Sequence, residues 1–303
     1  MAGTASLPHV MMRYFTTPSV RTARRSVGWS LFFIFLLYSS APMLATLSKI
    51  SLMDPNLATG IIGKSITEVQ ALDWYQNWNQ AKLMFVSDFN GNGTLELNEF
   101  FMKGSAVVLA TPEIAGLPYV ISGLVAAGGM AAAMSTADGL VLAISNALSH
   151  DVYYKIINPK AETAKRLIVA RVLLVLIGFA GATIAALEIQ GILGSVIWAF
   201  DFAMSGLFFP LVLGVWWKRA NAPGAVAGML LGLISGTAYL IWVRSGGSGF
   251  LGITQLTFGI VGAAVSLVSM VVVSLITAAP DAATQKMVDD VRIPSGKTVL
   301  AQK

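Results

Sequence analysis

The chain has 303 residues, of which 55% are hydrophobic and 12% charged, and its mean hydropathy is +0.72. Soluble domains carry about 25% charged residues, so the composition excludes a soluble globular protein and predicts a membrane protein. The lack of cysteine excludes disulfide scaffolds and thiolate metal sites. The net charge of +5 comes from segments beside apolar runs, which argues against a nucleic-acid site.

Six apolar runs are long enough to cross a bilayer as helices, which takes about 20 residues each. We predict an all-α membrane protein whose first span covers residues 28–48. Five further spans lie in 112–277, approximately at 119–148, 167–187, 192–217, 223–243 and 252–277. The remaining segments are a basic stretch at 1–27, a long polar insert at 49–111 and a polar tail at 278–303. Glycines repeat every four residues from Gly224 to Gly236, and small residues also crowd 123–129, which indicates closely packed helix faces.

The distribution of basic residues predicts the orientation. If residues 1–27 are cytoplasmic, fifteen of the twenty Lys and Arg residues fall on the cytoplasmic side and five on the outside. Cytoplasmic loops are enriched in Lys and Arg. We therefore expect a multi-pass protein of the plasma (inner) membrane with both ends of this chain in the cytoplasm.

The polar insert contains a twelve-residue segment, 88–99, with the spacing of an EF-hand calcium loop. Its candidate ligands are Asp88, Asn90, Asn92, Thr94, Glu96 and Glu99. Gly93 stands at the sixth position, where the loop turns sharply. We expect flanking helices at 67–86 and 97–109, with Trp74, Tyr75 and Trp78 on the outer membrane surface. The alternative is an Asn/Gly-rich turn that binds no calcium.

The second predicted span ends in GGMAAAMSTADGLVLAISNALSHD, residues 128–151. On a helix Ala132, Ser135 and Thr136 share one face, and a carbonyl with two hydroxyls forms a neutral oxygen set that suits Na⁺. The alternative is that the hydroxyls bond back to carbonyls one turn earlier. Asp138 is an intramembrane acid, which by default indicates a functional site; we assign it to a second cation or a proton.

Asp201, in the fourth predicted span, raises the same question. It faces a substrate path, pairs with a basic residue from elsewhere, or lies near a boundary. An enzyme is not expected, because the sequence contains no nucleophile elbow, phosphate-binding loop or histidine zinc pair.

Several blocks resemble the sodium:solute symporter family, and its cation/acetate branch most closely. They read GTASLPHVMMRYFTTPSVRTARRSVGW, ATPEIAGLP, GGMAAAMSTADGLVLAISNALSHDVYY and FPLVLGVWWKRANAPGAVAGM. The resemblance covers most of the chain except the EF-hand-like insert and the tail. It implies the C-terminal part of an inverted-repeat, LeuT-like transporter fold with ion and substrate sites near the midplane.

The resemblance also implies a function. It predicts symport of Na⁺ with a small organic anion such as acetate by alternating access, with sodium bound at Ala132, Ser135 and Thr136. Family members are longer, and this chain starts after their sixth core helix, so the N-terminal half is expected as a partner. The alternatives are a calcium-responsive membrane sensor that does not transport, and an inactive truncated fragment.

Overall fold

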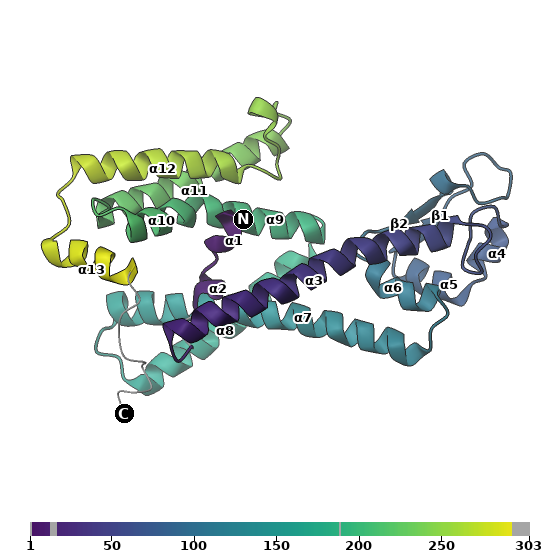
Figure 1. The fold of residues 1–303 in the computed structure, drawn as a ribbon, viewed down its shortest axis with the longest axis horizontal. Helices are drawn as coiled ribbons and strands as arrows, with labels where there is room; N and C mark the ends of the chain where they lie inside the picture. Colours follow the sequence, from purple (N-terminus) through teal and green to yellow (C-terminus); the bar gives the residue numbers. More distant parts are fainter. Residues whose placement is uncertain (1, 13–16, 188, 293–303) are drawn as a thin grey trace. The chain divides into compact units, whose positions relative to one another are not determined.

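The computed structural model describes residues 2–12, 17–187 and 189–292, and they are mostly helical (Figure 1). The chain divides into two compact units, one made of residues 1–23 and 138–303 and the other of residues 24–137. The α-helices are α1 (Ala2–Ala5), α2 (Pro8–Met12), α3 (Val20–Met53), α4 (Ile66–Gln70), α5 (Asp73–Gln80), α6 (Val107–Ile114), α7 (Tyr119–Asn146), α8 (Thr163–Ala186), α9 (Ile192–Ala203), α10 (Phe209–Trp216), α11 (Ala222–Arg244), α12 (Gly259–Ile276) and α13 (Ala282–Arg292). They are joined by the π-helices η3 (Ala147–Ile157) and η4 (Met204–Phe208), the 3₁₀ turns η2 (Leu97–Glu99) and η5 (Phe250–Gly252), and the strands β1 (Met84–Val86) and β2 (Phe100–Met102).

Among the described residues, six helices are long and apolar enough to cross a membrane, which confirms the predicted all-α membrane class. They are Val20–Met53, Tyr119–Ile157, Thr163–Ala186, Ile192–Trp216, Ala222–Arg244 and Gly259–Ile276. Two of them extend well beyond the predicted apolar runs. The first begins at Val20, and the second continues through η3 to Ile157. Helices continue past the hydrocarbon into polar sequence, where hydropathy gives no signal.

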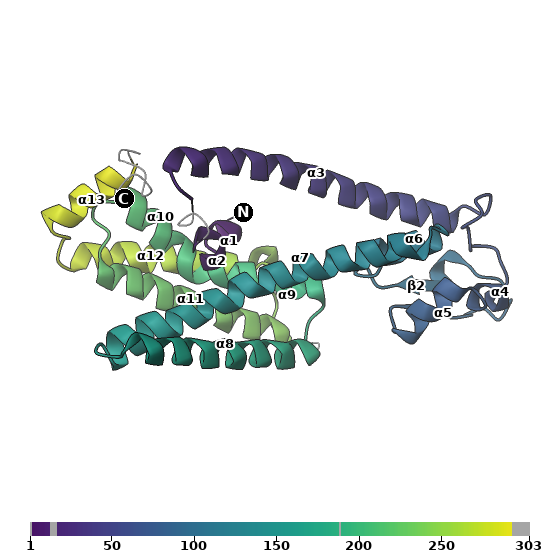
Figure 2. The ribbon, with the colours of Figure 1, turned by 90° about the horizontal axis from the view of Figure 1, so that it is seen from below.

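The C-terminal unit is built around α11 and α12, which lie side by side in both views (Figures 1 and 2). The glycines of α11 make this close approach possible: a Cβ at Gly232 would lie 2.1 Å from the Ser205 carbonyl oxygen and 2.8 Å from the Ser266 Cβ. Ser205 belongs to η4, the π-helical turn between α9 and α10. Pro210 follows four residues after Gly206 and has no N–H for its carbonyl, which accounts for an irregular turn here.

Residues 2–12, predicted as part of a polar cytoplasmic segment, form α1 and α2. Helix α1 packs on α9 and η4 so closely that a Cβ at Gly3 would lie 2.4 Å from the Phe200 carbonyl oxygen. Ser6 is fully buried and donates its hydroxyl to the Ala2 carbonyl at 2.7 Å. The start of the chain is therefore part of the packed unit.

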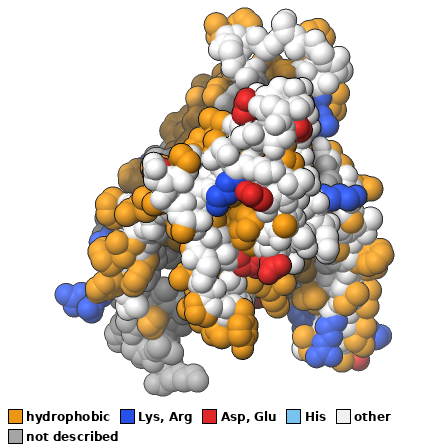
Figure 3. Space-filling model, turned by 90° about the vertical axis from the view of Figure 1, so that its right-hand side faces the viewer, with side chains coloured by type: hydrophobic (Ala, Val, Ile, Leu, Met, Phe, Trp, Pro, Cys, Tyr) orange, Lys and Arg blue, Asp and Glu red, His pale blue; other side chains and the backbone are white. Residues whose placement is uncertain are grey.

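The insert between α3 and α7 has a hydrophobic core of its own. Nine side chains form it, namely Leu52, Ile61, Ile66, Val69, Tyr75, Met84, Leu95, Ala110 and Ile114. Strands β1 and β2 pair antiparallel, with Phe85 opposite Phe101. Because Leu52 comes from α3 and Ala110 from α6, this core joins the insert to the ends of its flanking helices. On the face drawn in Figure 3, acidic side chains lie among uncharged polar and hydrophobic atoms.

The predicted helices on either side of the EF-hand-like segment are wrong. Only the short helices α4 and α5 lie in the predicted range 67–86; strand β1 precedes the segment, η2 forms its last three residues and β2 follows it, so a hairpin carries the loop in place of a helix pair. The predicted contact of Trp74, Tyr75 and Trp78 with the outer membrane surface does not fit either. Tyr75 is 4% exposed, and Trp74 and Trp78 pack against the insert core.

Candidate functional site

The candidate sodium ligands lie on α7 within one turn of each other. Thr136 donates its hydroxyl to the Ala132 carbonyl oxygen at 3.3 Å, and Ser135 precedes Thr136 on the same helix. All three residues are exposed. Thr136 thus makes the back-bond that the alternative interpretation of the sequence describes.

This back-bond does not by itself argue against a cation. A hard cation bound at about 2.4 Å, in the range of Ca²⁺–oxygen bonds, holds neighbouring oxygens about 3.4 Å apart, and Na⁺ has a similar ionic size. The 3.3 Å between Thr136 Oγ1 and the Ala132 oxygen matches that spacing. Thr136 and Ala132 therefore place two neutral oxygens side by side on this face of α7.

Asp138 also lies on α7 and is exposed. It follows Ser135 by three residues, so its side chain lies near the edge of the same helix face. The boundary between the two units falls between residues 137 and 138, within this helix.

Asp201 is buried in the C-terminal unit, with 9% of its surface exposed. Its carboxylate accepts a backbone hydrogen bond from Gly259, the first residue of α12, while Oδ2 has no hydrogen-bond partner among the described residues. A Cβ at Gly259 would lie 2.8 Å from the Asp201 Cα, so only glycine permits this approach. An acid at a helix N-terminus satisfies an orphan N–H and interacts favourably with the helix dipole. This contact between Asp201 and the Gly259 N–H differs from the basic partner and from the substrate contact that the sequence analysis considered for Asp201.

The EF-hand-like loop is folded around its own polar side chains. Asp88 accepts the N–H groups of Gly91 at 2.7 Å and Gly93 at 3.1 Å. Asn92 Oδ1 accepts the N–H of Thr94 at 2.7 Å. Gly93 has φ +70°, the left-handed conformation that the sharp turn at this position requires.

Glu99 closes the loop from within the insert. Its side chain is fully buried and accepts the N–H groups of Phe89 and Glu96, each at 3.0 Å. The Asn90 amide donates to Glu96 at 2.9 Å. Carboxylate oxygens have further lone pairs for a cation. Within the described residues no three His, Cys, Asp or Glu side chains cluster for metal binding, so amide and hydroxyl oxygens would make up part of the ligand set.

Sequence reasoning missed one polar contact in the insert. Trp78 donates its indole N–H to Glu113 at 3.0 Å, and Glu113 is the penultimate residue of α6. Glu113 also helps to line a cleft of about 770 Å³, together with Asp73, Tyr119 and Ser122. No local motif marks this contact, because its partners are 35 residues apart.

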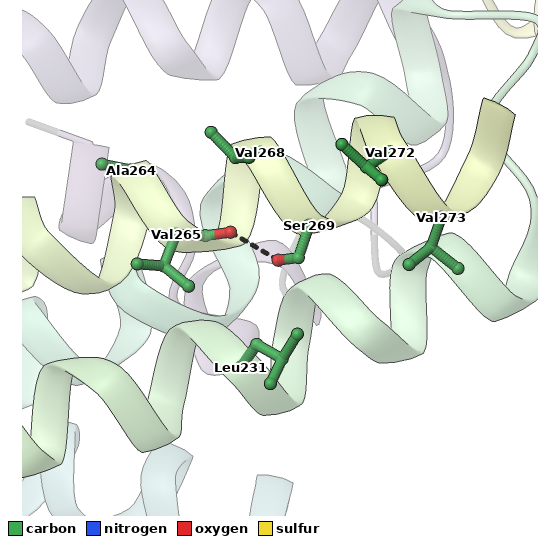
Figure 4. Close-up of a pocket in the computed structure, with 7 residues that line it drawn as sticks. All are labelled: Leu231, Ala264, Val265, Val268, Ser269, Val272 and Val273. Carbon is green, nitrogen blue, oxygen red and sulfur yellow. Dashed lines mark hydrogen bonds between the residues drawn. The ribbon is translucent and has the colours of Figure 1, made fainter. Parts of the chain in front are cut away.

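A groove along α11 and α12 offers no ligand set for an ion. Its volume is about 480 Å³, and its lining residues are Leu231, Ala264, Val265, Val268, Ser269, Val272 and Val273 (Figure 4). The Ser269 hydroxyl is already bonded to the Val265 carbonyl. The aliphatic lining suits contact with lipid chains.

Comparison with known proteins gives one matching family and curated relatives. Residues 103–232 match the model of the sodium:solute symporter family. The chain is 41% identical over 287 residues to an uncharacterized symporter of Cupriavidus necator, covering 91% of this chain and 41% of that protein. It is 27% identical over 235 residues to a monocarboxylic acid transporter of Corynebacterium glutamicum, covering 77% of this chain and 35% of that protein. The chain thus spans about two fifths or less of these relatives' length.

Proposed function

Residues 103–232 belong to the sodium:solute symporter family, and from this premise we propose that the chain is the C-terminal portion of a sodium-coupled symporter. Its proposed substrate is a short monocarboxylate such as acetate, which alternating access carries inward. The family supports sodium coupling, and the monocarboxylic acid transporter among the relatives supports the substrate class. The matching family and both relatives are described as symporters or transporters, and we therefore propose no enzymatic role.

The observation that carries the proposal is the oxygen pair on α7. Thr136 Oγ1 and the Ala132 carbonyl lie 3.3 Å apart on an exposed face, and the Ser135 hydroxyl completes the proposed half-site. The coupling ion is proposed to bind oxygens of this face of α7 together with oxygens of a second helix, and so to hold the two helices together. The second helix is proposed to lie in the N-terminal portion of the transporter, which the relatives' greater length supports.

The test is sodium-dependent acetate uptake into vesicles that carry the full transporter. We expect Ser135→Ala/Thr136→Val to raise the sodium concentration for half-maximal uptake at least about tenfold, equivalent to about 1.4 kcal/mol of binding free energy. The matched control is Thr183→Val. Thr183 is an exposed threonine on α8 that bonds back to Phe179 at 2.9 Å. An unchanged sodium requirement in the double variant, or an equal change in the control, would overturn the assignment.

Asp138 and Asp201 are proposed for two further roles, a second cation or proton site and the substrate path. Support for Asp138 is its place beside the hydroxyl face. Support for Asp201 is its buried Oδ2 without a partner in the described part of the chain. Asp201→Asn keeps an oxygen for the Gly259 N–H. If Asp201 only caps α12, this variant keeps its acetate KM, whereas a residue on the substrate path changes it.

We also propose that the loop 88–99 binds calcium weakly, with a dissociation constant of about 10⁻⁴–10⁻³ M as in extracellular modules. Its preformed turn and buried Glu99 support this. Calcium should protect the loop from proteolysis in the wild type and in the control Glu68→Gln, but not in Glu99→Gln. Equal cleavage in calcium and in chelator would reject the site.

The proposed location is the plasma membrane, with both ends of the chain in the cytoplasm. The excess of basic residues on one side of the six spans supports this orientation. Because the chain has no cysteine, single cysteines at Lys160 and Lys64 test it with an impermeant thiol reagent on intact cells. Lys64→Cys should react and Lys160→Cys should not.

A further inference from the structure

Helix α13 (Ala282–Arg292) follows the last spanning helix and has two different sides. Its apolar arc contains Met287, Val288 and Val291, which lie within one turn of each other. The rest of the circumference is polar and includes Lys286 and Asp290, both exposed. This pattern is typical of helices that lie in the plane of a membrane surface.

Part of the helix is fixed to the protein. Asp289 pairs with Lys218 and with Arg292, each at 2.7 Å. The Arg292 guanidinium lies over the ring of Trp216 at 5.7 Å, and Val288 is 8% exposed. Since Trp216 is the last residue of α10, these contacts hold α13 against the end of a spanning helix.

The other part of the apolar arc is uncovered. Met287 is 58% exposed and Val291 is 62% exposed, and they are neighbours four residues apart. The last residues of the two neighbouring spanning helices are also exposed, Ile276 of α12 at 77% and Trp216 of α10 at 65%. Only residues 277–281 separate α12 from α13.

We propose that Met287 and Val291 insert into the lipid at the membrane surface where α10 and α12 end, so that α13 is an interfacial anchor. Two spanning helices place it there: α12 through the short connection and α10 through Lys218 and Trp216. At that level the apolar arc meets acyl chains while Lys286 and Asp290 remain in water. The anchor does not depend on which ion or solute is transported.

Single-cysteine variants of this 303-residue chain test this, because the chain contains no other cysteine. Bimane is attached at Met287→Cys, Val291→Cys or Lys286→Cys, and the protein is reconstituted in phosphatidylcholine vesicles. Brominated lipid should quench positions 287 and 291 several-fold more than position 286, and aqueous iodide should show the reverse order.

Two outcomes would overturn the anchor. Iodide quenching at 287 and 291 equal to that at 286 would mean that the arc faces water. Protection of 287 and 291 from both quenchers would mean that another protein surface covers them. A further arm repeats the measurement with Asp289→Ala, which removes the docking contacts; lipid quenching at 291 should then fall several-fold, and no change would reject the role of α10 in placing the helix.

Discussion

Helices α7 and α11 are both rich in small residues, yet they differ in what those residues meet. In α11, Gly228 and Gly232 are buried against α12, and an added Cβ would lie 3.0 Å or less from neighbouring atoms. In α7, an added Cβ at Gly123 or Gly128 meets nothing within 4 Å, and the residues around Ser135 are exposed. Small residues thus indicate that a helix can be approached closely, while the partner has to be found in the structure.

The largest effect should come from filling the α11 seam. Gly232→Ala places a Cβ 2.1 Å from a backbone oxygen, so η4 or α11 has to shift. We expect a loss of about 3 kcal/mol in the free energy of unfolding, the upper part of the range for overpacking. Denaturation of the purified protein in mild detergent measures it. Gly128→Ala is the control and should leave stability within about 0.5 kcal/mol; equal losses would erase the contrast between the helices.

A smaller effect should come from the contact that holds the C-terminal end of α7. Ser145 is 2% exposed and donates its hydroxyl to the Ala170 carbonyl of α8 at 2.8 Å. Ser145→Ala should cost about 1 kcal/mol, as for one interhelical hydrogen bond in a membrane protein. Thr183→Val, which removes a bond within one helix, should cost less. If the two variants melt alike, α7 is not anchored through Ser145.

The smallest effect concerns a contact in water rather than in the bundle. The hydrogen bond from Lys218, with its charge, holds the pKa of Asp289 below the ordinary value. Because the folded pKa is lowered, the pair contributes to α13 docking above the ordinary carboxyl pKa of about 3.9. That contribution is lost as the pH falls through the lowered pKa, and it is small because the pair is exposed.

A spin label at Val291→Cys reports this docking. Its mobility should be constant from neutral pH to about pH 4 and should rise below that value. In Asp289→Asn the mobility should be raised already at neutral pH and should not change across the acid range. An identical acid transition in that variant would assign the titration to another group.

Much of the bundle was predictable because hydropathy measures the property that decides membrane insertion. The six spans are confirmed within the described residues, and residues 103–232 match the model of the family that the sequence blocks resemble. The ends were not predictable. Helix α3 begins before its apolar part and includes Arg21, Arg24 and Arg25, and η3 extends the second span to Ile157. Long-range contacts were not predictable either. Asp201 and Gly259 are 58 positions apart, and no local sequence pattern indicates that they meet.

The insert shows the limit of a motif. The EF-hand spacing concerns the twelve residues of the loop, and those residues make the turns the spacing requires. It says nothing about the flanks, where Met84–Val86 and Phe100–Met102 pair as strands. The sodium ligands Ala132, Ser135 and Thr136 remain a prediction, because the rest of their coordination shell has to come from another element.

The nine-residue core of the insert has a thermodynamic consequence. It is assembled between two spanning helices from side chains such as Leu95 and Met84, both fully buried. Opening such a core exposes apolar surface to water and raises the heat capacity. Separating α11 from α12 exchanges protein contacts for lipid contacts, without that hydration term. Cooling therefore weakens the insert while it leaves the bundle largely unaffected, so one polypeptide combines a temperature-sensitive part with a part that responds little.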